Sequence, residues 1–237
     1  MASCGAQLQR PITFLVCDLQ EKVREACGMG ADRQFQGAIF HFDSVVQTTS
    51  KLLRAAAVLD IPVLGTEQYP KGLGRTVPRI ADAVSAVPKH ATEAKTAFSM
   101  VSNDLVLTMQ QRATGQHASY IDVDFAICGI ESHVCVLQTV LDLRQRGARV
   151  HVVQDAVSSC NREEIPTALE AMRTAGADIT TSESLLFRIL GNSSHPHFRA
   201  VSALIVGAAH LVALTQQREE KETTARALAA LLGTEGA

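Results

Sequence analysis

Hydrophobic runs alternate with amphipathic stretches along most of the chain. The runs Ile12–Cys17, Ile61–Thr66 and Asp124–Ile130 carry little polar alternation, which is typical of strands that are covered on both faces. Val150–Gln154 and Asp178–Thr181 predict two further short strands. Strands that alternate with helices predict a parallel sheet with helices on both sides, which is an α/β fold.

Amphipathic spacing predicts helices between these strands. Asp43 and Ser44 are candidate N-caps for one helix, and Asn161 is a candidate N-cap for a helix that Gly176 ends. A further helix follows the third strand and reaches Gly147. Because ligands bind at the carboxyl ends of the strands in such sheets, we expect functional residues directly after the strands.

Composition indicates one globular domain. The chain has 237 residues, of which 46% are hydrophobic, so it can bury a large core and is not globally disordered. Lys and Arg number 22 and Asp and Glu 24, a net charge of −2, which lacks the basic excess of a nucleic-acid-binding protein. We expect an N-terminal tail over residues 1–10, a domain over residues 11–206 and a helical extension over residues 207–237. Residues 27–42 predict a loop of unassigned role.

The cysteines and the N-terminus bear on the cellular compartment. Six cysteines occur without a CxxC pair, which favours a reducing compartment over a disulfide framework. Cys17 and Cys128 lie in hydrophobic runs and are interpreted as small buried hydrophobic residues. The first ten residues lack the hydrophobic core of a secretory signal, and Ala203–Leu214 is too short to cross a bilayer. We therefore expect a cytoplasmic protein without a membrane partner, with a mitochondrial association left open.

Three chemically capable residues lie at or near strand ends. Asp18 directly follows the first strand, where a catalytic carboxylate and a structural turn residue are both open interpretations. Cys135 falls in the first helical turn after Gly129, where free amides favour a thiolate, and a packed core cysteine is the alternative. Lys95, taken alone, is interpreted as a surface residue. Taken as a set, the three can supply a base, a nucleophile and a fixed cation.

The order and spacing of five short segments resemble the isochorismatase-like hydrolases of the cysteine hydrolase superfamily. These segments are Phe14–Gln20, Thr66–Gly74, Lys95–Ser99, Gly129–Cys135 and Val152–Ala156. The second of them, TEQYPKGLG, is similar to the subgroup of isochorismatase domain-containing proteins. The resemblance implies a three-layer αβα fold with a Rossmann-like, six-stranded parallel sheet.

The resemblance also implies a set of site residues. The family's catalytic triad falls on Asp18, Lys95 and Cys135, with the cysteine as nucleophile and the aspartate as base. A cis peptide bond is implied between Ile130 and Glu131, and the backbone N–H groups of Glu131 and Cys135 would form an oxyanion hole. The implied activity is hydrolysis of an amide-like or other small acyl substrate through a thioester.

Two differences between this sequence and other members of the superfamily narrow the range of expected reactions. The Asp-x-His metal motif of nicotinamidases is missing after the second strand, so we expect no metal and no cofactor. Isochorismate-cleaving members work without a cysteine nucleophile, so Cys135 favours acyl chemistry. Possible pocket residues are Gln20, Gln68 and Tyr69, the last two in the loop after the second strand, and Phe98. Each has a structural alternative, and Gln20 is better suited to steadying the loop after the first strand.

Other function classes stay open at this point. A non-catalytic oligomeric binding protein is the alternative, and the complete triad argues against it. A ribonuclease is less favoured, because the net charge of −2, with eight phenylalanines, two tyrosines and no tryptophan, gives no visible surface for RNA. We therefore expect a small-molecule substrate and no nucleic-acid partner. Family members commonly form symmetric oligomers, so the resemblance implies a homo-oligomer, dimeric or higher.

Overall fold

The computed structural model of the chain describes residues 8, 10–22 and 39–207. The tail expected up to residue 10, the loop expected over residues 27–42 and the extension expected from residue 207 lie wholly or mostly outside the described residues. The main elements are β1 (Ile12–Cys17), α2 (Phe42–Leu59), β2 (Val63–Gln68), α3 (Pro70–Leu73), α4 (Pro78–Ser85), β3 (His90–Lys95), α5 (Leu105–Thr114), β4 (Asp124–Ile130), α6 (Leu137–Gln145), β5 (Arg149–Ser158), α7 (Glu164–Thr174), β6 (Asp178–Thr180) and α8 (Ser182–Leu190). No helix among the described residues is long and apolar enough to cross a membrane.

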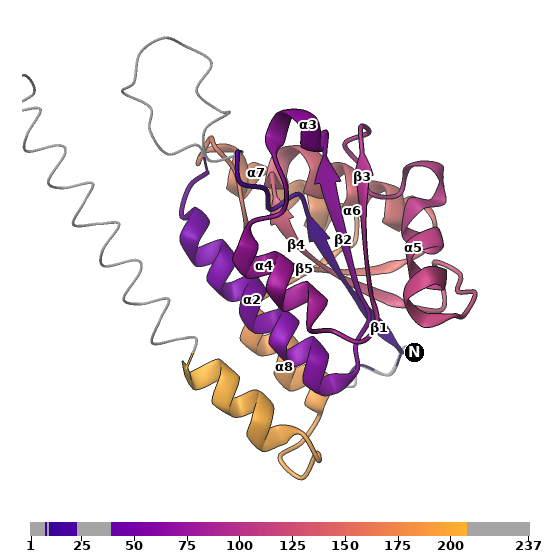
Figure 1. Ribbon diagram of the computed structural model, residues 1–237, viewed down its shortest axis with the longest axis vertical. Coiled ribbons are helices and arrows are strands. Elements are labelled where there is room, and N and C mark those ends of the chain that lie inside the picture. The colour runs from indigo at the N-terminus through magenta and orange to yellow at the C-terminus, as the bar shows by residue number, and fades with distance from the viewer. Residues whose placement is uncertain (1–7, 9, 23–38, 208–237) are drawn as a thin grey trace, which may run out of the picture.

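The strands form one six-stranded parallel sheet in the order β3-β2-β1-β4-β5-β6, which confirms the predicted fold class. β1 is central and pairs with both β2 and β4 (Figure 1). Its last residue, Cys17, lies level with Thr66 of β2 and Gly129 of β4. The carboxyl ends of these three strands are therefore neighbours at one edge of the sheet.

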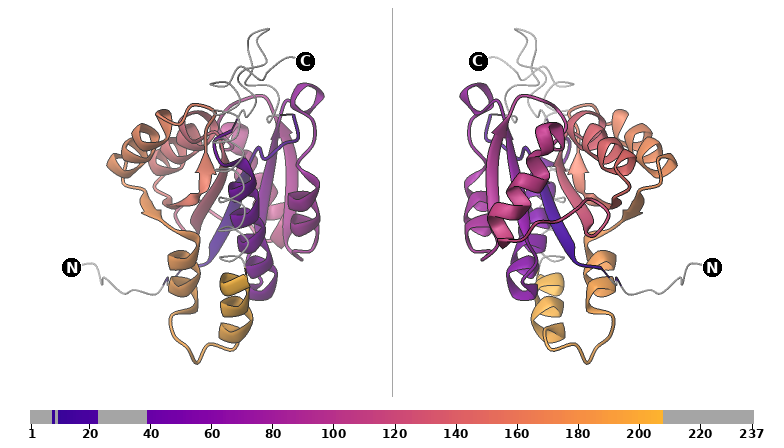
Figure 2. Two further views of the ribbon diagram at one scale, coloured as in Figure 1. Left: turned by 90° about the vertical axis from the view of Figure 1, so that its left-hand side faces the viewer. Right: turned by 90° about the vertical axis from the view of Figure 1, so that its right-hand side faces the viewer.

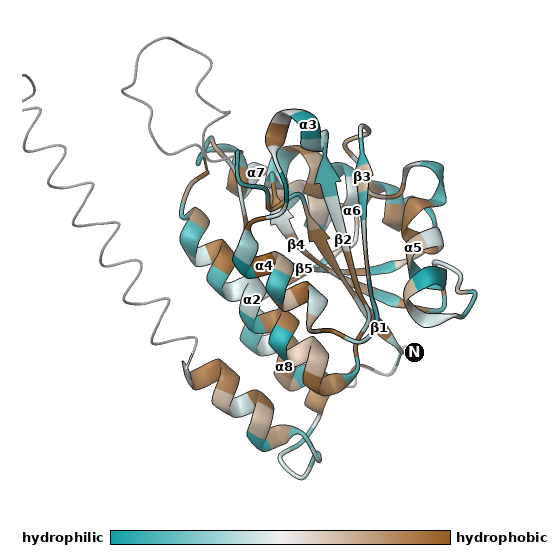
Figure 3. Cartoon of the chain, viewed as in Figure 1, coloured by the Kyte–Doolittle hydropathy of each residue, from teal (hydrophilic) through white to brown (hydrophobic). Residues whose placement is uncertain are grey.

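Helices cover both faces of the sheet, which gives the three expected layers (Figures 1 and 2). α2, α4 and α8 pack on one face, and α5, α6 and α7 pack on the other. Hydrophobic residues line the central strands, whereas α2 and α4 carry mixed hydrophobic and hydrophilic residues (Figure 3). Along β1, Phe14 and Val16 belong to the first core, and Leu15 and Cys17 belong to the second. This alternation assigns each β1 side chain to one face.

The strands differ from the sequence-based expectation in two respects that bear on the site. β3 was not predicted, because its sequence, HATEAK, contains no large hydrophobic residue, and it lies at the edge of the sheet. β2 ends at Gln68 rather than Thr66, which places Gln68 in the strand instead of the following loop. The shift matters because the strand backbone now fixes the position of the Gln68 side chain.

Two predicted helix caps are also corrected. α2 begins at Phe42, so Asp43 and Ser44 lie within its first turn. α7 begins at Glu164, and the Asn161 side chain instead accepts a hydrogen bond from the backbone N–H of Glu163 at 3.1 Å. In both cases a polar residue marks the correct region but lies one to a few residues from the helix boundary.

The backbones of β1 and β4 approach closely at Gly129. This residue has φ +117°, and an added Cβ would lie 2.0 Å from the carbonyl oxygen of Cys17. A side chain cannot fit there without separating the two strands. Gly129 therefore holds the chain that leads to Cys135 against the end of β1.

A network of ion pairs joins the opposite ends of β4, β5 and β6. The fully buried Asp124 carboxylate accepts two hydrogen bonds from Arg149, at 2.8 and 2.9 Å, and lies 3.6 Å from His151. His151 also lies 2.8 Å from Asp178. Burial alone would raise the pKa of Asp124, but the contacts with His151 and Arg149 outweigh it and hold that pKa below its ordinary value. The ionised carboxylate therefore stabilises the fold.

We predict that Asp124→Asn lowers the free energy of unfolding by about 2 kcal/mol near neutral pH, because hydrogen bonds to a charged acceptor are lost. Since the folded-state pKa is depressed, the contribution is complete above the unfolded value of about 4 and is lost as the pH falls through the folded value. Urea unfolding at neutral and acidic pH measures the difference. Asp60→Asn, at a largely exposed ion pair with Lys89, is the control with a smaller effect. If the difference in unfolding free energy between the wild type and Asp124→Asn stays constant down to low pH, the Asp124 carboxylate is not the group that stabilises the fold.

Candidate active site

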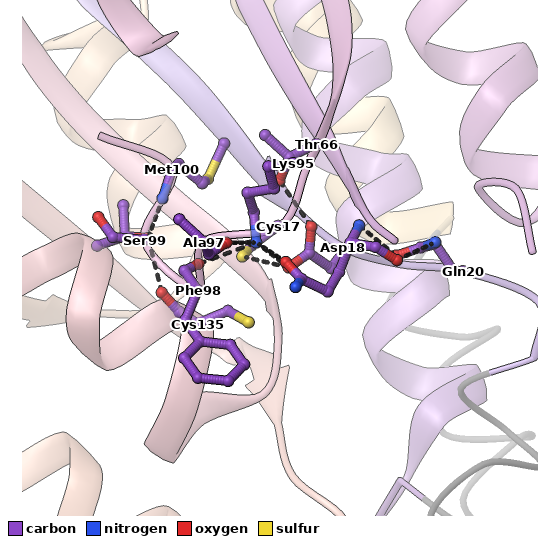
Figure 4. Close-up of polar contacts among 12 residues, drawn as sticks. Cys17, Asp18, Gln20, Thr66, Lys95, Ala97, Phe98, Ser99, Met100 and Cys135 are labelled. Atoms are coloured by element: carbon purple, nitrogen blue, oxygen red, sulfur yellow. Dashed lines mark hydrogen bonds and ion pairs between the residues drawn. The ribbon is translucent and has the colours of Figure 1, made fainter. Parts of the chain in front are cut away.

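A buried ion pair lies at the carboxyl ends of the central strands. The Lys95 Nζ atom is 2.6 Å from Asp18 Oδ2, and the two side chains are only 3% and 4% exposed. The other carboxylate oxygen, Oδ1, accepts a hydrogen bond from the Thr66 hydroxyl at 2.8 Å. Asp18 directly after β1, Thr66 of β2 and Lys95 of β3 thus meet from positions far apart in sequence (Figure 4).

The backbone at Asp18 adopts the left-handed conformation, with φ +50°. Aspartate tolerates this region better than most residues that carry a Cβ. Its N–H donates to the carbonyl oxygen of Thr66 at 3.2 Å, so the residue remains attached to β2 as the chain leaves the sheet. Unusual backbone geometry of this kind is concentrated at functional sites.

The Lys95 ammonium is surrounded by acceptors. Besides Asp18, it donates to Gln68 Oε1 at 2.8 Å and to the carbonyl oxygens of Phe98 at 2.9 Å and Ala97 at 3.2 Å. This environment compensates for the hydration that the ammonium loses on burial. The lysine is therefore a fixed internal cation, not the surface residue that an isolated lysine suggests.

The protonation of Lys95 follows from its surroundings. Burial alone would lower its pKa, but the neighbouring Cys17, Asp18 and Cys135 together raise that pKa above its ordinary value. The ammonium is consequently charged at any physiological pH. The site therefore holds a permanent positive charge paired with the Asp18 carboxylate.

Cys135 lies in a wide helical turn, Ser132–Val136, that leads into α6. The peptide bond between Ile130 and Glu131, directly before this turn, is cis, as the resemblance implies. The carbonyl oxygen of Cys135 accepts a hydrogen bond at 2.6 Å from the hydroxyl of Thr139. Wide turns of this type occur frequently at functional sites.

The Thr139 hydroxyl also connects the two halves of the site. It accepts a hydrogen bond from the backbone N–H of Met100 at 3.0 Å, in the segment that follows β3. The same segment supplies the carbonyl oxygens that hold Lys95. One threonine therefore fixes the turn that carries Cys135 relative to the segment after Lys95.

The structure brings the three residues expected from the sequence together. The Cys135 sulfur and one carboxylate oxygen of Asp18 lie within 4.8 Å of each other, and Lys95 contacts the same carboxylate. Cys135 is buried, with 7% of its surface exposed. A thiol beside a carboxylate and a fixed ammonium can act as a nucleophile with its own base.

The four residues expected at the pocket separate into two groups. Gln20 is fully buried, and its amide is bonded to the backbone of Gln68 and Gly74, so it steadies a loop and does not face a pocket. Gln68 bonds Lys95 with its oxygen and Thr96 O with its nitrogen, which is a positioning arrangement. By contrast, Tyr69 after β2 and Phe98 after β3 are 56% and 51% exposed. These two side chains remain candidates for substrate contact.

Sequence reasoning missed three residues that contact the triad: Cys17, Thr66 and Thr139. Thr139 had a local signal, since it lies four residues after Cys135, on the same helix face. Thr66 and Cys17 had no such signal, because each reads as part of a hydrophobic strand. The contact of Thr66 with Asp18 and the approach of Cys17 to Cys135 depend on strand order, which the local pattern does not encode.

The donor atoms of Cys17, Asp18 and Cys135 lie close enough together to suggest a metal site. The chemistry of the cluster argues against a resident cation. The Lys95 ammonium already binds Asp18 Oδ2 and would repel a divalent ion. Burial, together with contacts from Cys135 and Asp18, also raises the pKa of Cys17 well above its usual value, whereas a metal-binding thiol must lose its proton. The residues present do not fit a catalytic metal.

Comparison with known proteins agrees with this geometry. The isochorismatase domain family model matches residues 13–184. Among curated relatives, isochorismatase domain-containing protein 2A from Mus musculus is 38% identical over 205 residues, covering 86% of this chain and 87% of that protein. Isochorismatase domain-containing protein 2 from Homo sapiens is 36% identical over 204 residues, with the same coverage of 86% and 87%.

Solved structures show the same fold. The MAR1 ribonuclease from Caenorhabditis elegans superimposes with a TM-score of 0.70 at 38% identity, covering 83% of this chain and 90% of that chain. The YcaC gene product of Escherichia coli, described as an octameric hydrolase of unknown specificity, gives a TM-score of 0.67 at 18% identity, covering 90% and 98%. At that identity, the second comparison supports the fold alone.

We predict that Lys95→Met lowers the free energy of unfolding by about 3–5 kcal/mol, because it leaves the Asp18 carboxylate buried without its partner. The double variant Asp18→Asn/Lys95→Met should recover part of this loss, since neither charge then remains. Urea unfolding of the two single variants and the double variant measures the coupling. Lys89→Met, at a partly exposed lysine, is the control with a small effect. If the losses of unfolding free energy at positions 18 and 95 are strictly additive, the two side chains do not form an energetically coupled ion pair.

Proposed function

Because the chain belongs to the isochorismatase domain family, we propose that it is a cysteine hydrolase that acts on an amide-like or other small acyl substrate without a metal or cofactor. One observation carries the proposal. The Cys135 sulfur lies within 4.8 Å of a carboxylate oxygen of Asp18, which a buried ammonium fixes at 2.6 Å. A non-catalytic binding protein would have no need for this arrangement.

The reaction proceeds in two halves. Asp18 takes the proton of Cys135, and the thiolate attacks the carbonyl carbon of the substrate. The tetrahedral intermediate collapses to a thioester when Asp18 returns the proton to the leaving amine. A water molecule, activated by the same carboxylate, then hydrolyses the thioester and releases the acid and the free thiol. Lys95 keeps its proton throughout and stabilises the negative charge that moves between sulfur and carboxylate.

The turn that holds Cys135 supplies the remaining elements. The backbone N–H groups of Glu131 and Cys135 form the oxyanion hole, where each donor is worth about 3 kcal/mol in the transition state. Tyr69 and Phe98 present exposed aromatic side chains after β2 and β3. They lie at the strand ends that carry the triad and are the candidates for contact with the non-reacting part of the substrate.

We also infer a homo-oligomer, dimeric or higher. Three large hydrophobic side chains remain exposed at separate positions, Phe187 at 39%, Ile121 at 56% and Val206 at 72%, and contact with another subunit would bury them. The octameric state described for the YcaC gene product is a property of that protein, and it sets a precedent for assembly on this fold.

Ribonuclease activity is the second candidate, because the C. elegans protein described as a MAR1 ribonuclease is 38% identical to this chain. The net charge of −2 does not favour a long RNA ligand. Acyl hydrolysis accounts for the cysteine nucleophile and its buried ion pair, so it remains the leading proposal.

We predict that Cys135→Ala abolishes hydrolysis of a substrate identified from a pool of small amides and esters, because no thioester can form. Intact-protein mass spectrometry of the wild type should show a covalent acyl adduct on Cys135 before turnover is complete. Cys160→Ser, at an exposed cysteine, is the matched control and should keep both the adduct and the activity. Turnover by Cys135→Ala close to that of the wild type would refute the nucleophile.

The same variants distinguish the ribonuclease. We predict that purified wild-type protein leaves single-stranded RNA uncleaved at physiological salt, with the products resolved by electrophoresis. RNA cleavage that disappears in Cys135→Ala would instead establish the second candidate at this site. Cleavage that persists in Cys135→Ala would indicate a contaminating nuclease.

A further inference from the structure

The proposed hydrolysis assigns no role to the Cys17 thiol, which also lies at the site. Cys17 is the last residue of β1 and is fully buried. Its sulfur, the sulfur of Cys135 and a carboxylate oxygen of Asp18 all lie within 4.8 Å of one another (Figure 4). The other described cysteines lie elsewhere: the Cys128 thiol donates to Leu15 O in the strand interior, and Cys160 is exposed.

The surroundings of Cys17 keep it a neutral thiol. Burial, the contact with Cys135 and the charge of Asp18 raise the pKa of Cys17 well above its ordinary value, and Lys95 offsets this in part. A neutral thiol does not compete with Cys135 for an acyl substrate, because the thiolate is the nucleophilic form. The Cys17 sulfur lies 3.5 Å from Asp18 Oδ2, so a proton acceptor is at hand once Cys17 reacts.

We propose that Cys17 is a resolving cysteine, which captures Cys135 as a disulfide after Cys135 is oxidised by a hydroperoxide. The inference shares with the proposed function the reactivity of the Cys135 thiolate, but it requires no acyl substrate. It gives the site a second reaction, with peroxides as the co-substrate class, and it makes the hydrolase reversibly sensitive to oxidants.

The chemistry balances in two steps. The Cys135 thiolate attacks one oxygen of hydrogen peroxide and the O–O bond breaks. Hydroxide is the leaving group, and Cys135 becomes a sulfenic acid. Cys17 then attacks that sulfur, Asp18 accepts the Cys17 proton, and the departing hydroxyl takes up a proton to leave as water. Two thiols are oxidised and one peroxide is reduced to two waters. An external dithiol reverses the reaction by exchange.

The geometry requires modest movement. A disulfide places its sulfurs about 2.05 Å apart, so atoms that start within 4.8 Å must approach further. Cys17 is held in the sheet, whereas Cys135 lies in the turn Ser132–Val136, before the regular part of α6. We expect that a change of the Cys135 rotamer and a shift of this turn bring the sulfurs together, while β1 stays in place.

The test treats the full-length protein with hydrogen peroxide in the absence of substrate and follows it by intact mass and peptide mapping. We expect the wild type to lose about 2 Da, the mass of two hydrogen atoms, with the peptides of Cys17 and Cys135 joined. Hydrolase activity should be lost in parallel, and dithiothreitol should restore both. In Cys17→Ala, Cys135 should instead gain about 32 Da as a sulfinic acid, which dithiothreitol does not reverse.

Cys128→Ala is the matched control, since Cys128 is also a buried strand cysteine but belongs to the other core. It should form the disulfide as the wild type does. The proposal is overturned if the wild type forms sulfinic acid at Cys135 as fast as Cys17→Ala does, or if Cys135 pairs with a different cysteine. The wild-type peptide map decides the question even if Cys17→Ala fails to fold.

Iodoacetamide labelling distinguishes failure of the resolving role of Cys17 from failure of the proposed hydrolase function. If Cys135 is alkylated faster than Cys160 near neutral pH but no disulfide with Cys17 forms, the resolving role fails while the nucleophile stands. If Cys135 is no more reactive than Cys160, both proposals lose their common basis.

Discussion

The buried ion pair between Lys95 and Asp18 is the constraint around which the site is organised. An isolated charge in the protein interior is strongly unfavourable, so neither residue can occupy its position without the other. The four acceptors of the ammonium come from β1, β2 and the segment after β3, and Asp18 is held in turn by Thr66 of β2. Satisfying this one charge therefore requires that three strand ends be in register.

The same contacts also fix the position of Cys135. The segment that supplies two carbonyl oxygens to Lys95 is also hydrogen-bonded, through Met100, to the Thr139 hydroxyl, which binds the carbonyl oxygen of Cys135. Gly129 holds β4 against the end of β1 just before the turn that carries the cysteine. The position of the sulfur is thus set by backbone contacts on both sides. A reactive group fixed in this way needs little reorganisation when charge develops.

The sequence predicts some of this structure well and some of it not at all. The hydrophobic runs of β1 and β4 identify the central strands, because both of their faces are covered. β3, with the sequence HATEAK, has no large hydrophobic residue, so hydropathy conceals the strand that delivers Lys95. The resemblance named Asp18, Lys95 and Cys135, which the structure brings together, yet the contact of Thr66 with Asp18 and the approach of Cys17 to Cys135 followed only from strand order. Contacts across 48 or more residues leave no trace in local periodicity.

The strand alternation of β1 explains why a second thiol lies beside the first. Leu15 and Cys17 face the same core as the nucleophile turn, whereas Val16 faces the opposite one, so the residue that precedes Asp18 necessarily points toward Cys135. A register shift by one residue would place Val16 there instead. Any small hydrophobic side chain would fill this space equally well. A cysteine adds what packing does not require, a thiol held neutral within reach of the reactive sulfur, and its chemistry is therefore the property to be explained.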